Sequence, residues 1–162
     1  MKTNGGFTLV EVIVVCALIA IMLSFASFEF RSFIVKTAME KQTRAIYNDI
    51  MMTRAQALYT RTAKRVVFTA ATFKIYSSLA SGSGINPVSN TILQYPVVFG
   101  GSGTVDFDEQ GFFDVVGNGN MTVCIEPSGN TSPVDSVVLF STRARIGKRN
   151  GGSCASTSIT VE

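Results

Sequence analysis

The chain begins with a long apolar run. From residue 7 to residue 28 the sequence carries a single charged side chain, Glu11. A helix of this length rises roughly 33 Å, about the thickness of a bilayer's hydrocarbon core. The run therefore predicts a membrane-spanning helix over residues 7–29. A cleavable signal peptide with a small-residue site near residues 24–26 is the alternative. Glu11 favours a retained helix, because a charge within a span costs about 2.5–3.5 kcal/mol and is expected to have a function.

Apolar residues continue at helical spacings beyond this run. They recur three, four and seven positions apart, as one face of an α-helix requires. The stripe consists of Phe33, Ile34, Met39, Ile46, Ile50, Ala57 and Leu58. No proline or glycine interrupts residues 7–80. We expect the helix to continue amphipathically over residues 30–63 and to end near residue 62.

The pattern changes to short β-branched and aromatic runs from residue 64. Glycine, asparagine and proline separate these runs, which is typical of strands joined by turns. The expected strands cover residues 65–70, 73–78, 91–99, 104–107, 121–126, 134–141 and 158–161. The fold class is therefore α+β: a long N-terminal helix packed on an antiparallel β-sheet or small β-sandwich over residues 64–162.

Composition excludes most enzyme classes. The 162 residues contain no histidine, so histidine-dependent triads, dyads and zinc sites are excluded. The sequence also has no nucleotide-binding glycine motif and no C-x-x-C pair. We expect no catalytic residue, cofactor or metal. Charge is segregated, with an excess of basic residues in 31–74 and 143–162 and only acidic residues in 75–142. This pattern predicts electrostatic contacts between faces or subunits or, alternatively, a helix with a solvated basic face beside an acidic sheet edge.

A short motif precedes the apolar run. The segment Gly6-Phe7-Thr8-Leu9-Val10-Glu11 resembles the signal of type IV pilins and type II secretion pseudopilins. The resemblance implies that prepilin peptidase cuts after Gly6, removes the leader 1–6 and N-methylates Phe7. Glu11 would then pair with the Phe7 amine of a neighbouring subunit, which offsets its burial. The alternative is that Glu11 lies hydrated at the level of the lipid headgroups.

The resemblance also implies a location and partners. It places the chain in the bacterial inner membrane as a single-pass protein with its C-terminal domain in the periplasm, and then in a filament. The basic residues after the span, such as Arg31 and Lys36, would favour the opposite orientation on charge alone. Expected partners are other pilin or pseudopilin subunits, prepilin peptidase and the inner-membrane assembly platform. Pilus, secretion pseudopilus and competence filament are not distinguished by these residues.

Two later segments resemble GspH/FimT-type minor pilins. Residues 105–111 are similar to their F-x-x-x-G turn, and residues 138–145 to a late strand that ends in Gly-Arg-x-Arg, although Thr142 stands at the glycine. In FimT-type proteins this region is implicated in DNA uptake. Only Arg143 and Arg145 match it, and Lys148 and Arg149 add charge. We expect these four residues in a mobile exposed loop that binds DNA or, alternatively, an acidic face of the next subunit.

The remaining candidates are cysteines and acids. Cys16 lies within the apolar run, whereas Cys124 and Cys154 lie in the expected exported domain. An oxidising periplasm would permit a disulfide between the latter two, and two reduced thiols are the alternative. The acids near Gly111 are Asp106, Asp108, Glu109 and Asp114. They weakly resemble a calcium loop, but a solvated acidic turn is the preferred interpretation because Gly117 occupies the position of the expected ligand.

Overall fold

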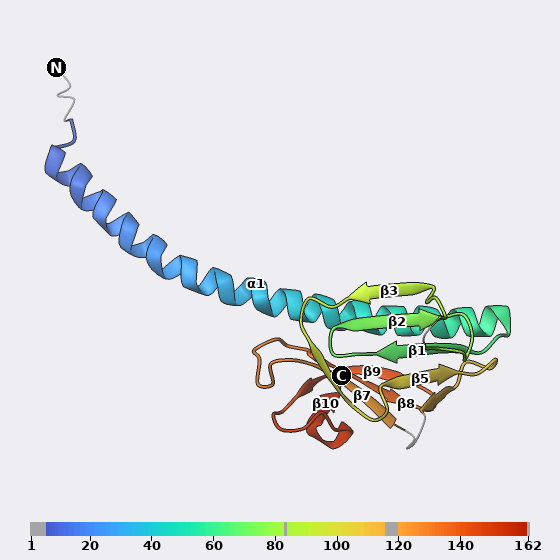
Figure 1. Cartoon of the computed structure of the whole chain (residues 1–162). Coiled ribbons are helices and arrows are strands. Elements are labelled where there is room, and N and C mark those ends of the chain that lie inside the picture. Colours follow the sequence, from blue (N-terminus) through green and yellow to red (C-terminus); the bar gives the residue numbers. More distant parts are fainter. Residues whose placement is uncertain (1–5, 83, 116–119, 162) are drawn as a thin grey trace. The chain divides into compact units, whose positions relative to one another are not determined.

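The structure, a computed structural model, describes residues 6–82, 84–115 and 120–161, without the side chains of residues 25–29 and 115. Helix α1 covers Leu9–Thr60 and precedes all the strands (Figure 1). The strands are β1 (Lys64–Phe68), β2 (Thr72–Tyr76), β3 (Ser89–Ile92), β4 (Val97–Gly100), β5 (Thr104–Phe107), β6 (Phe113–Val115), β7 (Asn120–Ile125), β8 (Ser136–Phe140), β9 (Ala144–Arg149) and β10 (Ile159–Val161). A short 3₁₀ helix, η1, covers Ser156–Ser158. The expected α+β class, with its long N-terminal helix and antiparallel strands, is confirmed.

The chain divides into two compact units, residues 1–35 and residues 36–162. Within the second unit, the apolar stripe of α1 is buried at Met39, Ile46, Ile50 and Ala57. The other members of the stripe, Phe33, Ile34 and Leu58, are exposed. The stripe thus serves the globular unit only from residue 39 onward.

Two threonines complete the buried face of α1. Thr43 and Thr53 are each 1% exposed, and each hydroxyl donates to the carbonyl four residues earlier, at 3.0 Å and 2.7 Å. This local bond satisfies the hydroxyl, so threonine can occupy a core position. A search for apolar residues overlooks both positions.

The strands form two antiparallel sheets. The first sheet has the order β3-β2-β1-β5-β6 and the second sheet the order β10-β9-β8-β7-β4. One core contains side chains from α1 and both sheets, including Ile50, Phe73, Phe107, Val123 and Leu139. A smaller cluster of Cys124, Val138 and Ile159 belongs to the second sheet. Of the two expected arrangements, one sheet or a small sandwich, the structure has two sheets around a shared core.

The expected strand over residues 91–99 was wrong, because the chain changes sheet within it. β3 ends at Ile92 in the first sheet and β4 begins at Val97 in the second. Between them, the Gln42 side chain on α1 accepts from the Tyr95 N–H at 2.9 Å and donates to its carbonyl at 2.8 Å. Pro96 lacks an N–H and cannot continue a ladder. A helix side chain therefore satisfies the backbone where strand pairing stops.

Two strands were not expected. β6 returns against β5 with Phe107 opposite Phe113. β9 occupies much of the segment that the sequence predicted as a mobile loop, and it pairs with both β8 and β10. The loop prediction was therefore wrong for residues 144–149.

Candidate functional site

The N-terminal candidates lie at the start of α1. Gly6, Phe7 and Glu11 are all exposed, and Phe7 and Glu11 line one shallow hollow four residues apart. Thr8 caps the helix, since its hydroxyl accepts from the Glu11 N–H at 3.2 Å. A carboxylate in the first helical turn is also favoured by the positive end of the helix dipole. Thr8 was not among the expected site residues, although threonine three positions before glutamate is a helix-start signal.

From Leu9 onward, the apolar run forms the first part of α1. Part of the expected membrane span, residues 25–29, lies outside the described side chains. Within the described residues, no helical segment has the length and apolar composition needed to cross a membrane.

Cys124 and Cys154 form a disulfide. Their Cα atoms lie 5.9 Å apart, and the bond joins β7 to the segment before η1. The Cys154 carbonyl also accepts from the Thr122 hydroxyl at 2.6 Å. A Cβ on Gly100 would meet that carbonyl at 2.3 Å, so the close approach requires glycine. The C-terminal segment is thus fastened to the second sheet. Cys16 is a free, exposed thiol.

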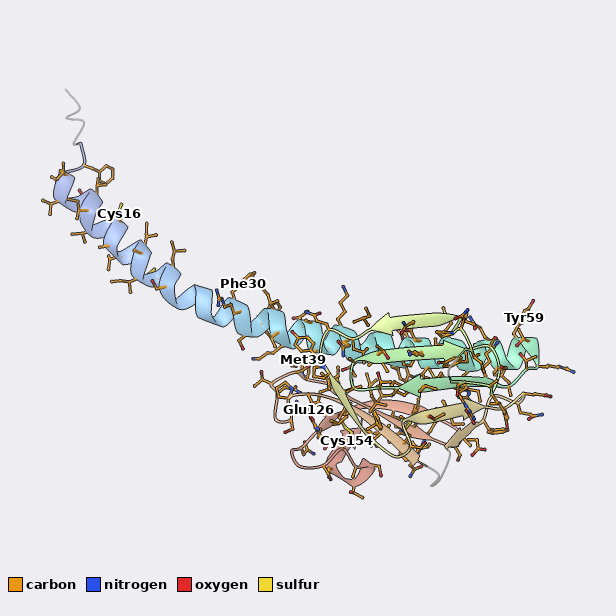
Figure 2. The ribbon with its side chains drawn as sticks, viewed as in Figure 1. Cys16, Phe30, Met39, Tyr59, Glu126 and Cys154 are labelled. Atoms are coloured by element: carbon orange, nitrogen blue, oxygen red, sulfur yellow. A yellow bond between two sulfur atoms is a disulfide. The ribbon has the colours of Figure 1, made fainter. Side chains whose placement is uncertain are left out.

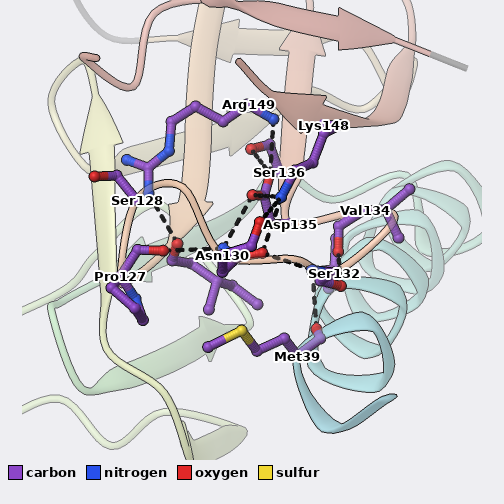
Figure 3. Close-up of polar contacts among 12 residues, drawn as sticks. Met39, Pro127, Ser128, Asn130, Ser132, Val134, Asp135, Ser136, Lys148 and Arg149 are labelled. Carbon is purple, nitrogen blue, oxygen red and sulfur yellow. Dashed lines mark hydrogen bonds and ion pairs between the residues drawn. The ribbon is translucent and has the colours of Figure 1, made fainter. Parts of the chain in front are cut away.

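Two of the four expected DNA-binding residues, Lys148 and Arg149, donate hydrogen bonds to other groups of the same chain (Figure 3). The Lys148 ammonium donates to Asp135 Oδ2 at 2.8 Å and to the Asn130 carbonyl at 2.6 Å. The Arg149 side chain is 1% exposed and donates to Glu126 Oε1 and to the Ile125 carbonyl, each at 3.0 Å. Lys148 therefore joins β9 to the loop before β8, and Arg149 joins β9 to the end of β7. The expectation that both are freely exposed was wrong.

Asp135 is the centre of this polar cluster. It is fully buried and also accepts from the Ser136 hydroxyl and from the Arg149 N–H. Burial acts to raise the pKa of Asp135, but hydrogen bonds from Lys148, the Arg149 backbone and Ser136 outweigh it, and the pKa is lowered. The nearby Ser132 hydroxyl lies 3.3 Å from the Lys36 carbonyl on α1, so the cluster reaches the helix.

Arg143 and Arg145 remain accessible. Arg143 follows the turn between β8 and β9, is exposed, and places its guanidinium 5.3 Å from the centroid of the Phe140 ring. Arg145 is half-buried and lies opposite Val138 in β8. Of the four basic candidates, these two offer charge to an external ligand.

The acidic candidates have separate structural roles. The two carboxylate oxygens of Asp106 accept hydrogen bonds from Nε and Nη2 of Arg65, each at 2.6 Å. This hydrogen bonding raises the pKa of Arg65. Asp108 accepts from the backbone of Gln110 and Phe112 at 2.9 Å and 2.7 Å, which closes the turn. Among the described residues, no three acidic or cysteine side chains gather closely enough to hold a metal ion.

This acidic turn docks on the end of α1. Gly111 adopts a φ of +73°, and a Cβ there would lie 2.7 Å from Leu58 Cγ. Arg54 donates to the Gly111 carbonyl at 2.8 Å and lies over the Phe113 ring. The glycine of the F-x-x-x-G segment is therefore required by a close helix contact and by the positive φ.

Comparison with known families gives one finding. Residues 1–27 match the prokaryotic N-terminal methylation motif. The chain thus carries a prepilin-type motif, which supports a type IV pilin-like protein that prepilin peptidase processes and that assembles with other pilins. Comparisons with curated proteins and with solved structures found no match.

The matched segment contains three of the expected site residues. Gly6, Phe7 and Glu11 all lie within residues 1–27, whereas the disulfide and the basic residues of β9 lie outside them. The motif supports a structural protein rather than an enzyme.

Proposed function

We propose that this chain is a structural minor pilin or pseudopilin of a type IV pilus or type II secretion system. The observation that carries the proposal is the N-terminal methylation motif at residues 1–27. Prepilin peptidase cuts after Gly6 and methylates the new amine of Phe7. The chain is anchored in the bacterial inner membrane, with residues 64–162 in the periplasm, until the assembly platform inserts it into the filament. The F-x-x-x-G turn docked on α1 supports the GspH/FimT type within this class.

Glu11 is the proposed assembly residue. After cleavage the Phe7 amine is positive, and the Glu11 carboxylate of an adjacent subunit pairs with it. The proposal is supported by the exposed hollow at the start of α1, which both Phe7 and Glu11 line. A carboxylate packed among apolar helices without such a partner would be costly, so the pair also sets the axial register.

The first experiment measures the N-terminus and intact mass of the protein from membranes of cells with and without prepilin peptidase. A chain that starts at methylated Phe7 only when the peptidase is present supports the proposal. A chain that starts near residue 27 in both strains would mean an ordinary signal peptide and would overturn it. As a second variant, Glu11→Gln should be cleaved normally but recovered from filaments at a much lower level.

DNA capture during natural transformation is the second candidate function. The observation that favours it is the accessibility of Arg143 and Arg145 beside the β8–β9 turn. Replacing both by alanine should lower DNA affinity and flatten its salt dependence, because phosphate contacts release counterions. Arg61→Ala is a matched control, since Arg61 is also exposed but lies at the end of α1. Equal DNA affinity of the unchanged protein, the double alanine variant and Arg61→Ala would exclude this function.

A further inference from the structure

The polar cluster around Asp135 brings an amine, an amide and a carboxylate into mutual contact (Figure 3). The Lys148 ammonium donates to Asp135 Oδ2 at 2.8 Å and to Asn130 Oδ1 at 2.9 Å. Asn130 Nδ2 donates to the same Asp135 oxygen at 3.0 Å. Asp135 Oδ2 therefore contacts both the amine nitrogen and the amide nitrogen, which is the position of a group that can move a proton from one to the other.

The Asn130 amide is oriented with its oxygen toward Lys148. The Ser132 N–H also donates to Asn130 Oδ1, at 3.1 Å. Both neighbours of this atom are donors, and only the oxygen of an amide accepts. Nδ2 also donates to the Pro127 carbonyl at 3.0 Å. The carbonyl oxygen next to the amine is thus already held by a backbone N–H, the kind of donor that stabilises negative charge developing on oxygen.

The carboxylate is buried and fixed. The Asp135 side chain is 0% exposed, and the Lys148 side chain is 28% exposed. Asp135 Oδ1 accepts from the Ser136 hydroxyl at 2.7 Å and from the Arg149 N–H at 2.8 Å. These bonds hold the carboxylate with Oδ2 at Lys148 and Asn130. Groups fixed in contact react as if each were present at a very high concentration, because the entropy of bringing them together has already been lost on folding.

We propose that Lys148 Nζ forms an isopeptide bond with Asn130 Cγ, with Asp135 as the catalytic residue. The Lys148 ammonium first gives a proton to Asp135 Oδ2. The electron pair of the neutral amine then attacks Asn130 Cγ, and Oδ1 takes the negative charge beside the Ser132 N–H. Asp135 gives its proton to Nδ2, the C=O bond re-forms, the Cγ–Nδ2 bond breaks and ammonia leaves. The new amide nitrogen loses its surplus proton through Asp135 to the ammonia, so Asp135 ends as a carboxylate and nothing is oxidised or reduced.

The first proton transfer is the unfavourable step. Burial favours a neutral amine and acid over the ion pair, whereas the hydrogen bonds from Ser136 and the Arg149 N–H favour the carboxylate. The pKa of Asp135 is lowered overall, so the transfer is uphill and the bond forms after folding. Folding is required in any case, since Lys148 lies on β9 and Asn130 lies in the loop before β8.

The isopeptide bond has a role distinct from that of the disulfide. Cys154, labelled in Figure 2, is bonded to Cys124 and fastens the segment before η1 to β7. The isopeptide bond joins β9 to the loop between β7 and β8, and it does not respond to reductants. The inference concerns the globular unit alone and holds whether or not the chain enters a filament.

The test is mass spectrometry of the full-length chain, extracted from membranes and reduced. We expect an intact mass lower by one ammonia than the mass that its sequence requires. A linked Lys148 resists trypsin, and residues 75–142 contain no lysine or arginine. Trypsin should therefore release residues 75–143 joined to residues 146–149 as one branched product that persists after reduction.

Three variants assign the roles. Lys148→Arg keeps a positive charge for Asp135 but removes the amine, because a guanidinium stays protonated, and it should abolish the ammonia loss. Lys74→Arg, on β2, is the matched control and should lose ammonia as the natural protein does. Asp135→Asn keeps the size of the side chain but cannot move the proton, and it should slow the linkage, followed over time after synthesis, about a hundredfold. Thiol labelling of Cys124 and Cys154 shows that each variant has folded and formed its disulfide.

A folded chain that keeps its ammonia after prolonged incubation, and whose Lys148 is cut by trypsin, overturns the proposal. An ammonia loss confined to linear peptides also overturns it, because an asparagine that closes on its own backbone loses ammonia without joining two peptides. The same holds for a loss that persists in Lys148→Arg. Equal rates of linkage in the natural protein and in a folded Asp135→Asn protein overturn the catalytic role of Asp135.

Discussion

The two compact units differ in how far their apolar and charged side chains find contacts within the same chain. In residues 36–162, apolar side chains of α1 pack against two sheets, and buried charges such as Asp135 and Arg149 have partners within the chain. In residues 1–35, α1 exposes large apolar side chains, including Val10, Ile13, Ile19 and Phe33. In residues 36–162 most of these contacts are internal, although the buried Nε of Arg149 has no hydrogen-bond partner. In residues 1–35 the large apolar side chains face outward. One helix therefore has a buried face in its second part and exposed apolar side chains in its first.

The sharpest test of this contrast compares two isoleucines of α1. Ile50 is 1% exposed in the globular core, and Ile19 is 50% exposed in the N-terminal unit. Ile50→Ala should lower the free energy of unfolding by about 2–5 kcal/mol, because it removes buried methyl groups and leaves a cavity. Ile19→Ala should change it by no more than about 0.5 kcal/mol. Urea unfolding of the full chain in detergent, followed by the circular dichroism of the sheets, measures both, and equal losses would contradict the contrast.

The next test compares two arginines of the second sheet. Arg149→Ala should lower the free energy of unfolding by about 2–3 kcal/mol, because the buried Ile125 carbonyl loses a charged hydrogen-bond donor. Glu126 keeps some access to water, which limits the loss. Arg143→Ala removes the same side chain at an exposed turn and should cost less than about 0.5 kcal/mol. The same urea titrations measure both changes. An Arg149→Ala protein as stable as the natural one would show that stability does not need the Arg149–Glu126 pair.

The smallest expected effect is on acid stability. The pKa of Asp135 is lower in the folded protein than its ordinary value, so the unfolded chain binds more protons at this site. Its contribution is present above the ordinary aspartate pKa, near 3.9, and is lost as the pH falls through the folded value. Unfolding free energies measured from pH 6 to pH 3 should therefore fall more steeply for the natural protein than for Asp135→Asn. Parallel curves would contradict the assigned role of Lys148 and Ser136.

Local sequence patterns predicted the parts of the fold that depend on neighbouring residues. The helix was expected because no glycine or proline interrupts it, and β5 was expected over residues 104–107, where it lies. The segment from Thr91 to Phe99 is rich in β-branched and aromatic residues but contains Pro96, a local signal against one continuous strand. Gln42, far away in sequence, holds the backbone at Tyr95 where the chain leaves one sheet for the other. That contact exists only in the folded chain.

The candidate sites show the same limit. The pairing of Cys124 with Cys154 was expected because these two cysteines lie together in the domain expected to be exported, and the structure contains the disulfide. The basic run at residues 143–149 was interpreted as a loop because it is charged and lies near glycines. Two of its charges instead meet Asp135 and Glu126, which are 13 and 23 residues away in sequence. β9 pairs with β8 and β10, and partners that are distant in sequence neutralise two of its charges, so its strand state depends on contacts that a local pattern does not contain.

The disulfide has a consequence for proteolysis of the globular unit. It joins β7 to the chain just before η1, so β8, the exposed β8–β9 turn and β9 all lie between the two bonded cysteines. A protease that cuts this turn, for example after Arg143, produces two fragments that stay covalently attached and that remain hydrogen-bonded within the second sheet. A nicked subunit held by this bond alone therefore keeps its full mass until it is reduced, and a single cut on this turn cannot shed the C-terminal strands.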